Sequence, residues 1–279
     1  MNSSTRNPHD LTAQWHHAVE YLGATAIPGI ALHSGVGDRT LSGPVKAPTG
    51  GEAWLRVMSS PRPEGKIWEG ATLAEEVLSD DVPRPRLLAD YTWSADGVYF
   101  RAHLWERARG RTLSDSPVLT SPPEVSDDWW RSLRAAANAV GRASLPPGRE
   151  VMTQAFINRI PGFLPELEGA DLTVGDWRTA HGDLHWANLT ANPLQLLDWE
   201  GWGAAPAGYD AAVLLAYSLP VPSVSERVRK EFAAELVTLT GRLAQLVICA
   251  EIIQASERDD LHARLRPYAE NLVAELAPQ

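Results

Sequence analysis

The pattern of hydrophobic and polar positions changes near residue 106. Before that point, short apolar runs alternate with Gly and Pro, which is typical of strands and turns. Strands are predicted over 29–33, 43–46, 53–58 and 98–105. Gly50-Gly51 separates two of these strands and predicts a hairpin turn. Apolar positions at helical spacing predict one helix over 68–78, which the Pro-containing segment 82–85 ends.

After residue 112 the apolar positions take helical spacing. Helices are predicted over 129–142, 226–239, 243–257 and 261–276. A short strand is predicted over 194–198, between helical regions. This order of elements predicts an α+β fold with a small sheet-rich lobe and a larger, mainly helical lobe. The chain is therefore divided into an N-terminal extension (1–24), an N-lobe (25–106) and a C-lobe (107–279).

Composition narrows the class of protein. The chain has 279 residues, of which 44% are hydrophobic and 22% charged, as in a soluble globular protein with an ample core. Its single cysteine, Cys249, lies in an apolar helical run and is expected to be a buried, inert thiol.

The polar N-terminus lacks the apolar core of a signal peptide. The apolar stretch 243–253 is too short and too interrupted to span a bilayer. We expect a cytoplasmic protein with no membrane partner.

The formal net charge of −10 disfavours a nucleic acid as partner, because phosphate backbones require basic surfaces. Two interpretations of the acidity stay open. It is compatible with an acidic cleft that attracts a cationic substrate, and equally with a generally acidic, soluble surface.

The strongest indication of chemistry lies between residues 181 and 198. His181, Asp183 and Asn188 follow the spacing His-x-Asp-x-x-x-x-Asn of a kinase catalytic loop. Asp198 follows the apolar end of the predicted strand 194–198. A migrating phosphoryl group carries dispersed negative charge, so its site needs hard cations more than a covalent nucleophile. Mg²⁺ prefers oxygen ligands and retains waters, so one amide and one carboxylate can hold it.

HGDLHWAN (181–188) and LLDWE (196–200) together resemble the aminoglycoside phosphotransferase and choline kinase-like family, small-molecule relatives of the protein kinases. The resemblance runs from about residue 25 to the C-terminus and implies a protein kinase-like two-lobe fold. It implies that Asp183 is the catalytic base and His181 shapes the loop. Asn188 and Asp198 would bind Mg²⁺, with ATP or GTP as phosphoryl donor. Many members have Pro-Gly where this chain has Trp186-Ala187, which implies a different backbone path there.

In the N-lobe, Gly35 and Gly37 predict either a turn over the nucleotide phosphates or an ordinary glycine turn. Arg56 occupies the strand position where the family usually has Lys and is the preferred phosphate contact, with Lys46 as the alternative. Glu69 is the predicted helix partner of this cation.

Glu75 and Glu76 are the other carboxylates of that helix and are compatible with a solvated face. Leu104 and Glu106, at the end of the last predicted strand, complete the candidate nucleotide contacts.

Several residues are candidates for contacting the acceptor substrate: His185, Trp199, Glu200, Trp202, Asp127 and Asp128. Indole faces cover sugars or bases, and carboxylates bind ammonium groups. Other interpretations stay open for most of them. His185 shapes the loop or, with His181, binds zinc; Glu200 contacts a second Mg²⁺ through water or caps a turn. Asp127 and Asp128 also suit the positive end of the following helix.

Asp210 precedes an apolar helix and predicts an N-cap, and its family counterpart also tethers the catalytic loop.

We therefore expect a phosphotransferase that acts on a hydroxyl of a small natural product, an antibiotic of the aminoglycoside or nucleoside- or sugar-containing kind. Phosphorylation would inactivate the antibiotic and give resistance. Two alternatives stay open: a metabolic kinase for choline, a sugar or homoserine, and a pseudokinase that binds nucleotide without turnover. The expected partners are a nucleoside triphosphate and a hydroxylated acceptor, and the protein is expected to be a monomer or dimer.

Overall fold

The computed structural model describes residues 11–144 and 147–277. The chain forms two compact units. Unit 1 comprises Met1–Glu76 and Pro85–Ala108, and unit 2 comprises Val77–Arg84 and Arg109–Gln279. The short piece 77–84 belongs to unit 2 because the carbonyl of Pro83 accepts a hydrogen bond from the backbone N–H of Leu196, at 2.8 Å.

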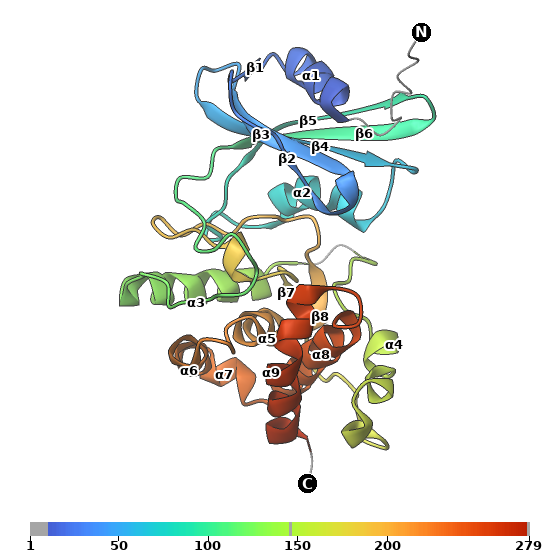
Figure 1. Cartoon of the computed structure of the whole chain (residues 1–279), viewed down its shortest axis with the longest axis vertical. Coiled ribbons are helices and arrows are strands. Elements are labelled where there is room, and N and C mark those ends of the chain that lie inside the picture. Colours follow the sequence, from blue (N-terminus) through green and yellow to red (C-terminus); the bar gives the residue numbers. More distant parts are fainter. Residues whose placement is uncertain (1–10, 145–146, 278–279) are drawn as a thin grey trace. The chain divides into compact units, whose positions relative to one another are not determined.

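Unit 1 is built on one antiparallel sheet with the strand order β1-β3-β4-β6-β5, and β2 pairs with β3 (Figure 1). Its strands are β1 (Thr25–Ala26), β2 (His33–Ser34), β3 (Thr40–Lys46), β4 (Glu52–Ser60), β5 (Leu87–Ala95) and β6 (Val98–Glu106). The predicted hairpin turn at Gly50-Gly51 is confirmed between β3 and β4. There Gly50 has φ +89°, and the backbone N–H of Ala47 donates to the carbonyl of Gly51 at 2.8 Å.

The sheet differs from the sequence-based expectation at three places, the first being the short strand β1, which was not predicted. The predicted strand 29–33 is reduced to His33–Ser34, because Gly29 has φ +76° and turns the chain before it. Strand β5 was not predicted. It lies at the edge of the sheet, and only alternate residues are half-buried, so its sequence mixes apolar and polar positions without a continuous apolar run.

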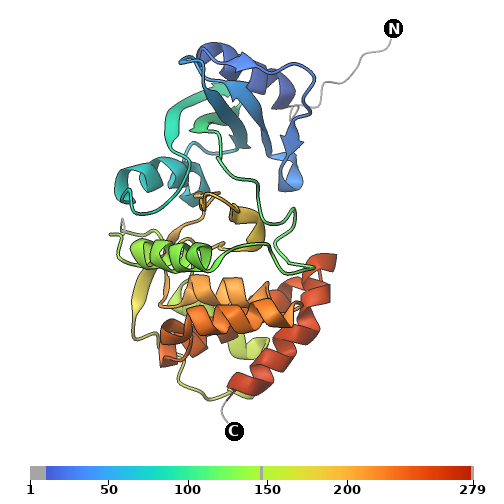
Figure 2. The ribbon, with the colours of Figure 1, turned by 90° about the vertical axis from the view of Figure 1, so that its left-hand side faces the viewer.

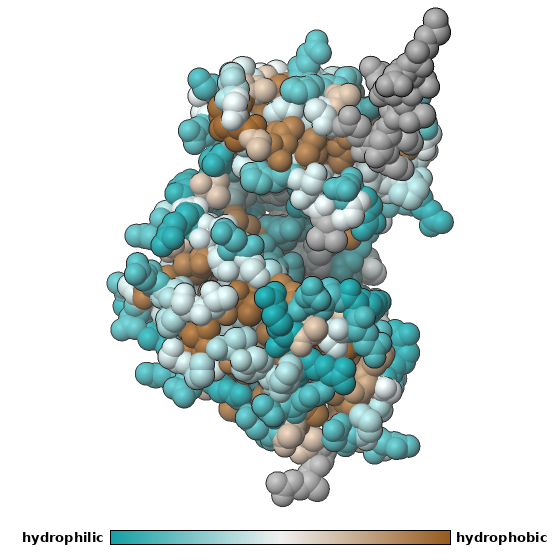
Figure 3. All heavy atoms as spheres, viewed as in Figure 1, coloured by the Kyte–Doolittle hydropathy of each residue, from teal (hydrophilic) through white to brown (hydrophobic). Residues whose placement is uncertain are grey.

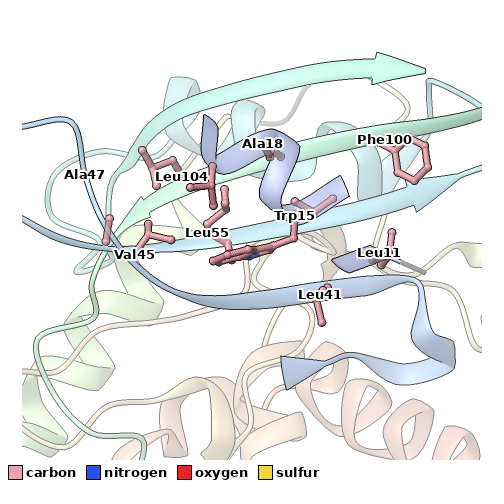
Figure 4. Packing of buried hydrophobic residues seen from close by; sticks show 13 residues of the cluster. Leu11, Trp15, Ala18, Leu41, Val45, Ala47, Leu55, Phe100 and Leu104 are labelled. Atoms are coloured by element: carbon pink, nitrogen blue, oxygen red, sulfur yellow. The ribbon is translucent and has the colours of Figure 1, made fainter. Parts of the chain in front are cut away.

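One face of the sheet is covered by helix α1 (Leu11–Tyr21). Figure 4 shows Trp15 extending from α1 over the strands that carry Val45 and Leu55, and the Trp15 indole N–H donates to the carbonyl of Leu55 at 3.4 Å. Residues 11–21 lie within the predicted N-terminal extension, yet they form α1 and supply part of the core of unit 1. The helix was missed because His16 and His17 interrupt its short apolar stripe.

The other face of the sheet meets helix α2 (Lys66–Val77), at the position predicted. Arg101 of β6 joins the two: its guanidinium donates to the backbone carbonyl of Trp68 at 2.7 Å and pairs with Asp90 of β5 at 2.8 Å. Odd-numbered residues of β6 therefore face α2, while Phe100, Ala102 and Leu104 face α1.

Unit 2 is mainly helical, as expected, and its C-terminal helices pack on one another in both ribbon views (Figures 1 and 2). Its longer helices are α3 (Asp127–Gly141), α5 (Tyr209–Ala216), α6 (Pro222–Glu231), α8 (Leu239–Ala255) and α9 (Asp260–Leu276). The short helix α4 (Gln154–Ile157) follows α3, and the short helix α7 (Ala233–Leu236) lies between α6 and α8. The predicted helix 226–239 is thus divided into α6 and α7, because the chain leaves helical geometry at Phe232.

A two-stranded sheet of β7 (Trp177–Ala180) and β8 (Gly203–Pro206) completes unit 2. The predicted strand 194–198 is wrong: this segment makes a single β-bridge, between Leu189 and Leu196. Cys249 is a buried free thiol in α8, as expected, and burial raises its pKa to about 12.

The visible face of unit 2 carries apolar residues scattered between hydrophilic ones (Figure 3). Among the described helices, none is both long and apolar enough to cross a membrane.

Candidate active site

The segment from residue 181 to 188 is a loop that follows β7 and ends in a short 3₁₀ turn, Trp186–Asn188. Asp210, in the first turn of α5, holds the start of this loop. Its carboxylate accepts the backbone N–H of His181 at 2.8 Å and that of Gly182 at 2.9 Å. Gly182 has φ +86°, and a Cβ there would lie 2.7 Å from Val151. Only glycine therefore fits between His181 and Asp183.

Asp210 is thus a tether rather than a helix cap. The N-cap residue of α5 is Gly208, and it makes no side-chain capping bond. Asp210 is buried, and this burial raises its pKa although the two loop N–H bonds favour the ionised form. The N-cap interpretation of Asp210 was wrong, and the tethering role implied by the resemblance agrees with the geometry.

His181 joins the loop to the segment that precedes Asp198. The ring is fully buried, and its Nε2 lies 2.7 Å from the carbonyl of Leu197. Its Nδ1 accepts the backbone N–H of Asp183 at 3.3 Å. Because a carbonyl only accepts, Nε2 carries the proton in this arrangement. The indole of Trp199 packs edge-on against the ring, 4.5 Å between centroids, and fixes its position.

Asp183 and Asn188 form the centre of the loop. The side-chain amide of Asn188 donates to the backbone carbonyl of Asp183 at 2.9 Å and to its carboxylate at 3.1 Å. His185 Nε2 lies 3.3 Å from the same carboxylate oxygen. Burial acts to raise the pKa of Asp183, but the hydrogen bond and charge of His185 outweigh it and lower the pKa. About half of the Asp183 side chain is exposed (54%), so an external group can reach a carboxylate that is ionised at neutral pH.

Asn188 and Asp198 present oxygen atoms suited to a hard cation. The nitrogen of the Asn188 amide is committed to Asp183, which turns its oxygen away from that residue. Asp198 is exposed and has φ +64°, a left-handed conformation that Asp tolerates better than most residues. In the described part of the chain, no three His, Cys, Asp or Glu side chains gather to hold a metal. A cation here would therefore be bound by few protein ligands, as Mg²⁺ often is.

In unit 1, Arg56 lies on β4 directly opposite His103 of β6, on the face that meets α2. His103 is fully buried, and its pKa is lowered to about 3. Burial is the larger cause, and the positive charges of Arg101 and Arg56 add to it. The neutral imidazole of His103 thus lies beside Arg56 and near Arg101, whose charge is matched by Asp90. Lys46 is exposed at the end of β3. Gly35 and Gly37 lie in the turn before β3, where Gly37 has φ +72°.

Of the three other candidate nucleotide contacts, two are engaged in the fold of unit 1 and one is exposed. Glu69 is exposed in the first turn of α2, and it is Glu75, further along the helix, that pairs with Arg86. The Leu104 side chain is buried in the core beneath α1, so it does not offer the contact proposed for it. Glu106 accepts the backbone N–H of Arg86 at 3.3 Å, which ties β6 to the start of β5.

The two tryptophans predicted to contact the acceptor are buried, and that prediction is wrong. Trp199 packs on His181, and its indole N–H donates to the carbonyl of Leu196 at 3.0 Å. Trp202 is fully buried beneath the guanidinium of Arg149, 4.8 Å from its ring centroid. The backbone carbonyl of Glu200 accepts a hydrogen bond from Arg149 at 2.7 Å, so the segment after Asp198 has a structural role.

Asp127 and Asp128 occupy the first turn of α3, behind the N-cap Ser126. Asp127 pairs with Arg227 at 2.7 Å, and this hydrogen bond lowers its pKa. Asp128 pairs with Arg131 of the same helix. Their charges are thus matched by arginines and by the helix dipole, so the helix-start interpretation agrees with the structure better than the substrate contact.

The sequence analysis missed a group of polar residues around Tyr217, the neighbour of His185: Glu251, Asp259 and His262. Tyr217 follows α5, and its ring meets His185 at 5.7 Å between centroids. The other three come from α8 and the start of α9. Their sequence separation hides their proximity, although Asp259 three residues before His262 has the spacing of an N-cap and indicated a helix start.

Residues 111–246 match the sequence model of a family described as the phosphotransferase enzyme family. The matched range contains the loop 181–188, Asp198 and Asp210. No curated protein matches the chain. The resemblance drawn from the motifs is thereby confirmed.

Solved structures of phosphotransferases are similar to the chain over nearly its whole length. A thermostable mutant of aminoglycoside phosphotransferase APH(4)-Ia, in ternary complex with ADP and hygromycin B, has a TM-score of 0.65 at 16% identity and covers 96% of this chain and 100% of its own. Macrolide 2'-phosphotransferase MphH from Brachybacterium faecium has a TM-score of 0.57 at 17% identity. The match covers 96% of this chain and 98% of the macrolide phosphotransferase.

Spectinomycin phosphotransferase APH(9)-Ia, in complex with ADP and spectinomycin, has a TM-score of 0.55 at 11% identity. The match covers 95% of this chain and 94% of the spectinomycin phosphotransferase. At these identities the similarity establishes the fold. The predicted α+β, protein kinase-like fold is confirmed.

Proposed function

We propose that this chain, whose residues 111–246 match the sequence model of the phosphotransferase enzyme family, transfers the γ-phosphoryl group of ATP or GTP to a hydroxyl of an antibiotic. The observation that carries the proposal is the loop geometry: an exposed, ionised Asp183 held by the amide of Asn188, on a backbone tethered by Asp210. Structures of the same fold hold ADP with hygromycin B or spectinomycin, which supports an antibiotic as acceptor.

In the proposed reaction, the Asp183 carboxylate accepts the proton of the acceptor hydroxyl. The hydroxyl oxygen forms a bond to the γ-phosphorus, and the bond from that phosphorus to the bridging oxygen of the β-phosphate breaks. Nucleoside diphosphate leaves with the bond electrons. His181 and Asp210 keep Asp183 in position through the backbone of the loop.

Asn188 and Asp198 are the residues that would hold Mg²⁺, which when bound neutralises the charge of the nucleotide phosphates. The donor set fits this ion because an amide oxygen and a carboxylate are both hard ligands. Arg56 is the proposed phosphate contact in unit 1, on the face of the sheet that meets α2. On this proposal the enzyme works in the cytoplasm, where nucleoside triphosphate is supplied, and phosphorylation inactivates the antibiotic.

The test is a nucleotide-consumption assay with Mg²⁺ and a panel of hygromycin B, spectinomycin and a macrolide, with the products analysed by mass spectrometry. We expect at least one compound to gain a single phosphoryl group. Transfer to choline, homoserine or a simple sugar, with none to the antibiotics, would identify a metabolic kinase instead. Nucleotide binding without transfer to any of these would support a pseudokinase.

A further inference from the structure

A chain of contacts connects Asp183 to the beginning of α9. His185 lies 3.3 Å from the Asp183 carboxylate, and its ring packs edge-on against the ring of Tyr217. The Tyr217 hydroxyl lies 3.1 Å from Nε2 of His262. On the far side of the imidazole, Nδ1 of His262 lies 2.6 Å from the carboxylate of Asp259. All five residues belong to unit 2.

Asp259 determines which nitrogen of His262 donates. One carboxylate oxygen accepts the backbone N–H of His262 at 2.9 Å; this bond caps α9 and lowers the pKa of Asp259. The ionised carboxylate only accepts, so Nδ1 of His262 donates to it. In the neutral ring, Nε2 then accepts the O–H of Tyr217. The Tyr217 proton is directed toward His262, and the lone pairs of its oxygen remain to accept another hydrogen bond.

The surroundings of Tyr217 favour a hydrogen-bond donor of the substrate as the partner of its phenol oxygen. Burial, followed by the charges of Asp183, Glu251 and Asp259, raises the pKa of Tyr217, so the side chain stays a neutral phenol. Glu251 itself accepts the hydroxyl of Tyr209 at 2.9 Å. The groups around the Tyr217 oxygen are therefore mainly hydrogen-bond acceptors, and a hydroxyl or ammonium group complements them.

We propose that Tyr217 recognises the acceptor substrate, its phenol oxygen accepting a hydrogen bond from a hydroxyl or ammonium group of that substrate while His262 and Asp259 hold the phenol in orientation. The reacting hydroxyl of the acceptor then binds Asp183, and a second hydrogen-bond donor of the same molecule binds Tyr217. His185 lies between the two protein residues and contacts both. This inference rests on the proposed function and narrows the acceptor to molecules with at least two hydrogen-bond donors. Tyr217 is a recognition residue, and His262 and Asp259 are positioning residues.

The test compares Tyr217→Phe with the wild type, using hygromycin B and spectinomycin as acceptor probes. The variant keeps the ring and loses only the hydroxyl. We expect the acceptor KM to rise about tenfold, the cost of one hydrogen bond of about 1.4 kcal/mol, with the nucleotide KM unchanged. Tyr268→Phe is the matched control: it removes a phenol hydroxyl from the exposed surface of α9 and should leave both KM values unchanged.

His262 provides a second readout. His262→Leu removes the partner of the Tyr217 hydroxyl and should raise the acceptor KM, whereas His262→Gln offers an amide oxygen and should restore most of the affinity. The double variant with Tyr217→Phe should be no worse than Tyr217→Phe alone, because both changes disrupt one interaction.

If the wild type phosphorylates a probe and Tyr217→Phe keeps the same acceptor KM, the inference is wrong and the proposed function stands. A His262→Leu variant that lowers the thermal midpoint without changing the acceptor KM would also overturn it, because the contact would then serve only to dock α9. Failure of the wild type to phosphorylate any probe would contradict the proposed function and this inference together.

Discussion

The amide of Asn188 bonds to Asp183 twice, to its backbone carbonyl at 2.9 Å and to its carboxylate at 3.1 Å. This pairing couples two proposed roles. It orients the carboxylate that is proposed to take a proton, and it turns the oxygen of Asn188 outward, where it is proposed to bind Mg²⁺. Substitutions in this pair should therefore affect catalysis more than the folding of unit 2.

Replacing Asp183 with Asn tests the proposed base. Asp183→Asn preserves the shape of the side chain and removes its charge, so turnover should fall by at least about 10²-fold, the low end of general-base contributions. Steady-state kinetics with a phosphorylated acceptor measure this. Asp176→Asn, which changes a half-exposed aspartate of the same unit, is the control and should keep wild-type turnover. Near-normal turnover of Asp183→Asn would exclude the assignment.

Asp198 is expected to be required for magnesium-dependent nucleotide binding. Asp198→Ala removes the carboxylate proposed as metal ligand, so calorimetric titration with Mg²⁺ and nucleotide should show no binding. Because Ala is strained at φ +64°, Asp198→Asn serves as a second variant that tolerates this backbone conformation. Unchanged titration of both variants would show that Asp198 does not hold the metal.

Arg56 should contribute to the binding of the nucleotide phosphates. Arg56→Ala is expected to weaken nucleotide binding by about 1.5–3 kcal/mol, the range for a lost charge-assisted hydrogen bond. Arg56→Lys should recover part or all of the affinity, because it keeps the positive charge. Lys46→Ala is the comparison. If it weakens binding while Arg56→Ala does not, the phosphate contact lies at the end of β3.

His103 should make stability depend on pH. Its pKa is about 3 in the folded chain against 6.5 in an unfolded one, so below pH 6.5 the unfolded state binds more protons. The contribution of neutral, buried His103 to the free energy of unfolding is fully present above pH 6.5. It is lost progressively as the pH falls toward 3. Between pH 7.5 and pH 5 it should reduce the free energy of unfolding by about 2 kcal/mol.

Denaturant unfolding at the two pH values measures this loss in the wild type and in His103→Leu. Neither ring nitrogen of His103 has a hydrogen-bond partner among the described residues, so the apolar replacement leaves no polar group unpaired. The difference between the two proteins isolates the histidine. His33→Leu, which replaces an exposed histidine of β2, should retain the wild-type pH dependence. Equal losses in His103→Leu and the wild type would refute the prediction.

The sequence by itself determined the fold class and the loop that carries the proposed chemistry. The spacing of His181, Asp183 and Asn188 lies within one short segment, and local spacing is what a sequence records directly. The hairpin at Gly50-Gly51 and the helices at 68–78, 129–142 and 261–276 also follow from local patterns, since turn chemistry and apolar periodicity need no distant partner.

Only the tertiary structure decided which side chains are free to meet a ligand. Trp199, Trp202 and Leu104 are chemically suited to ligands, but their burial depends on packing against residues far away in the chain. The charges of Asp127 and Asp128 are matched by arginines, one of them on another helix. Conversely, Tyr217 and His262 are 45 residues apart and meet only because α5 and α9 pack together. Hydrogen bonds between distant elements leave no periodic signal in a sequence, so tertiary structure alone could connect Asp183 to Asp259.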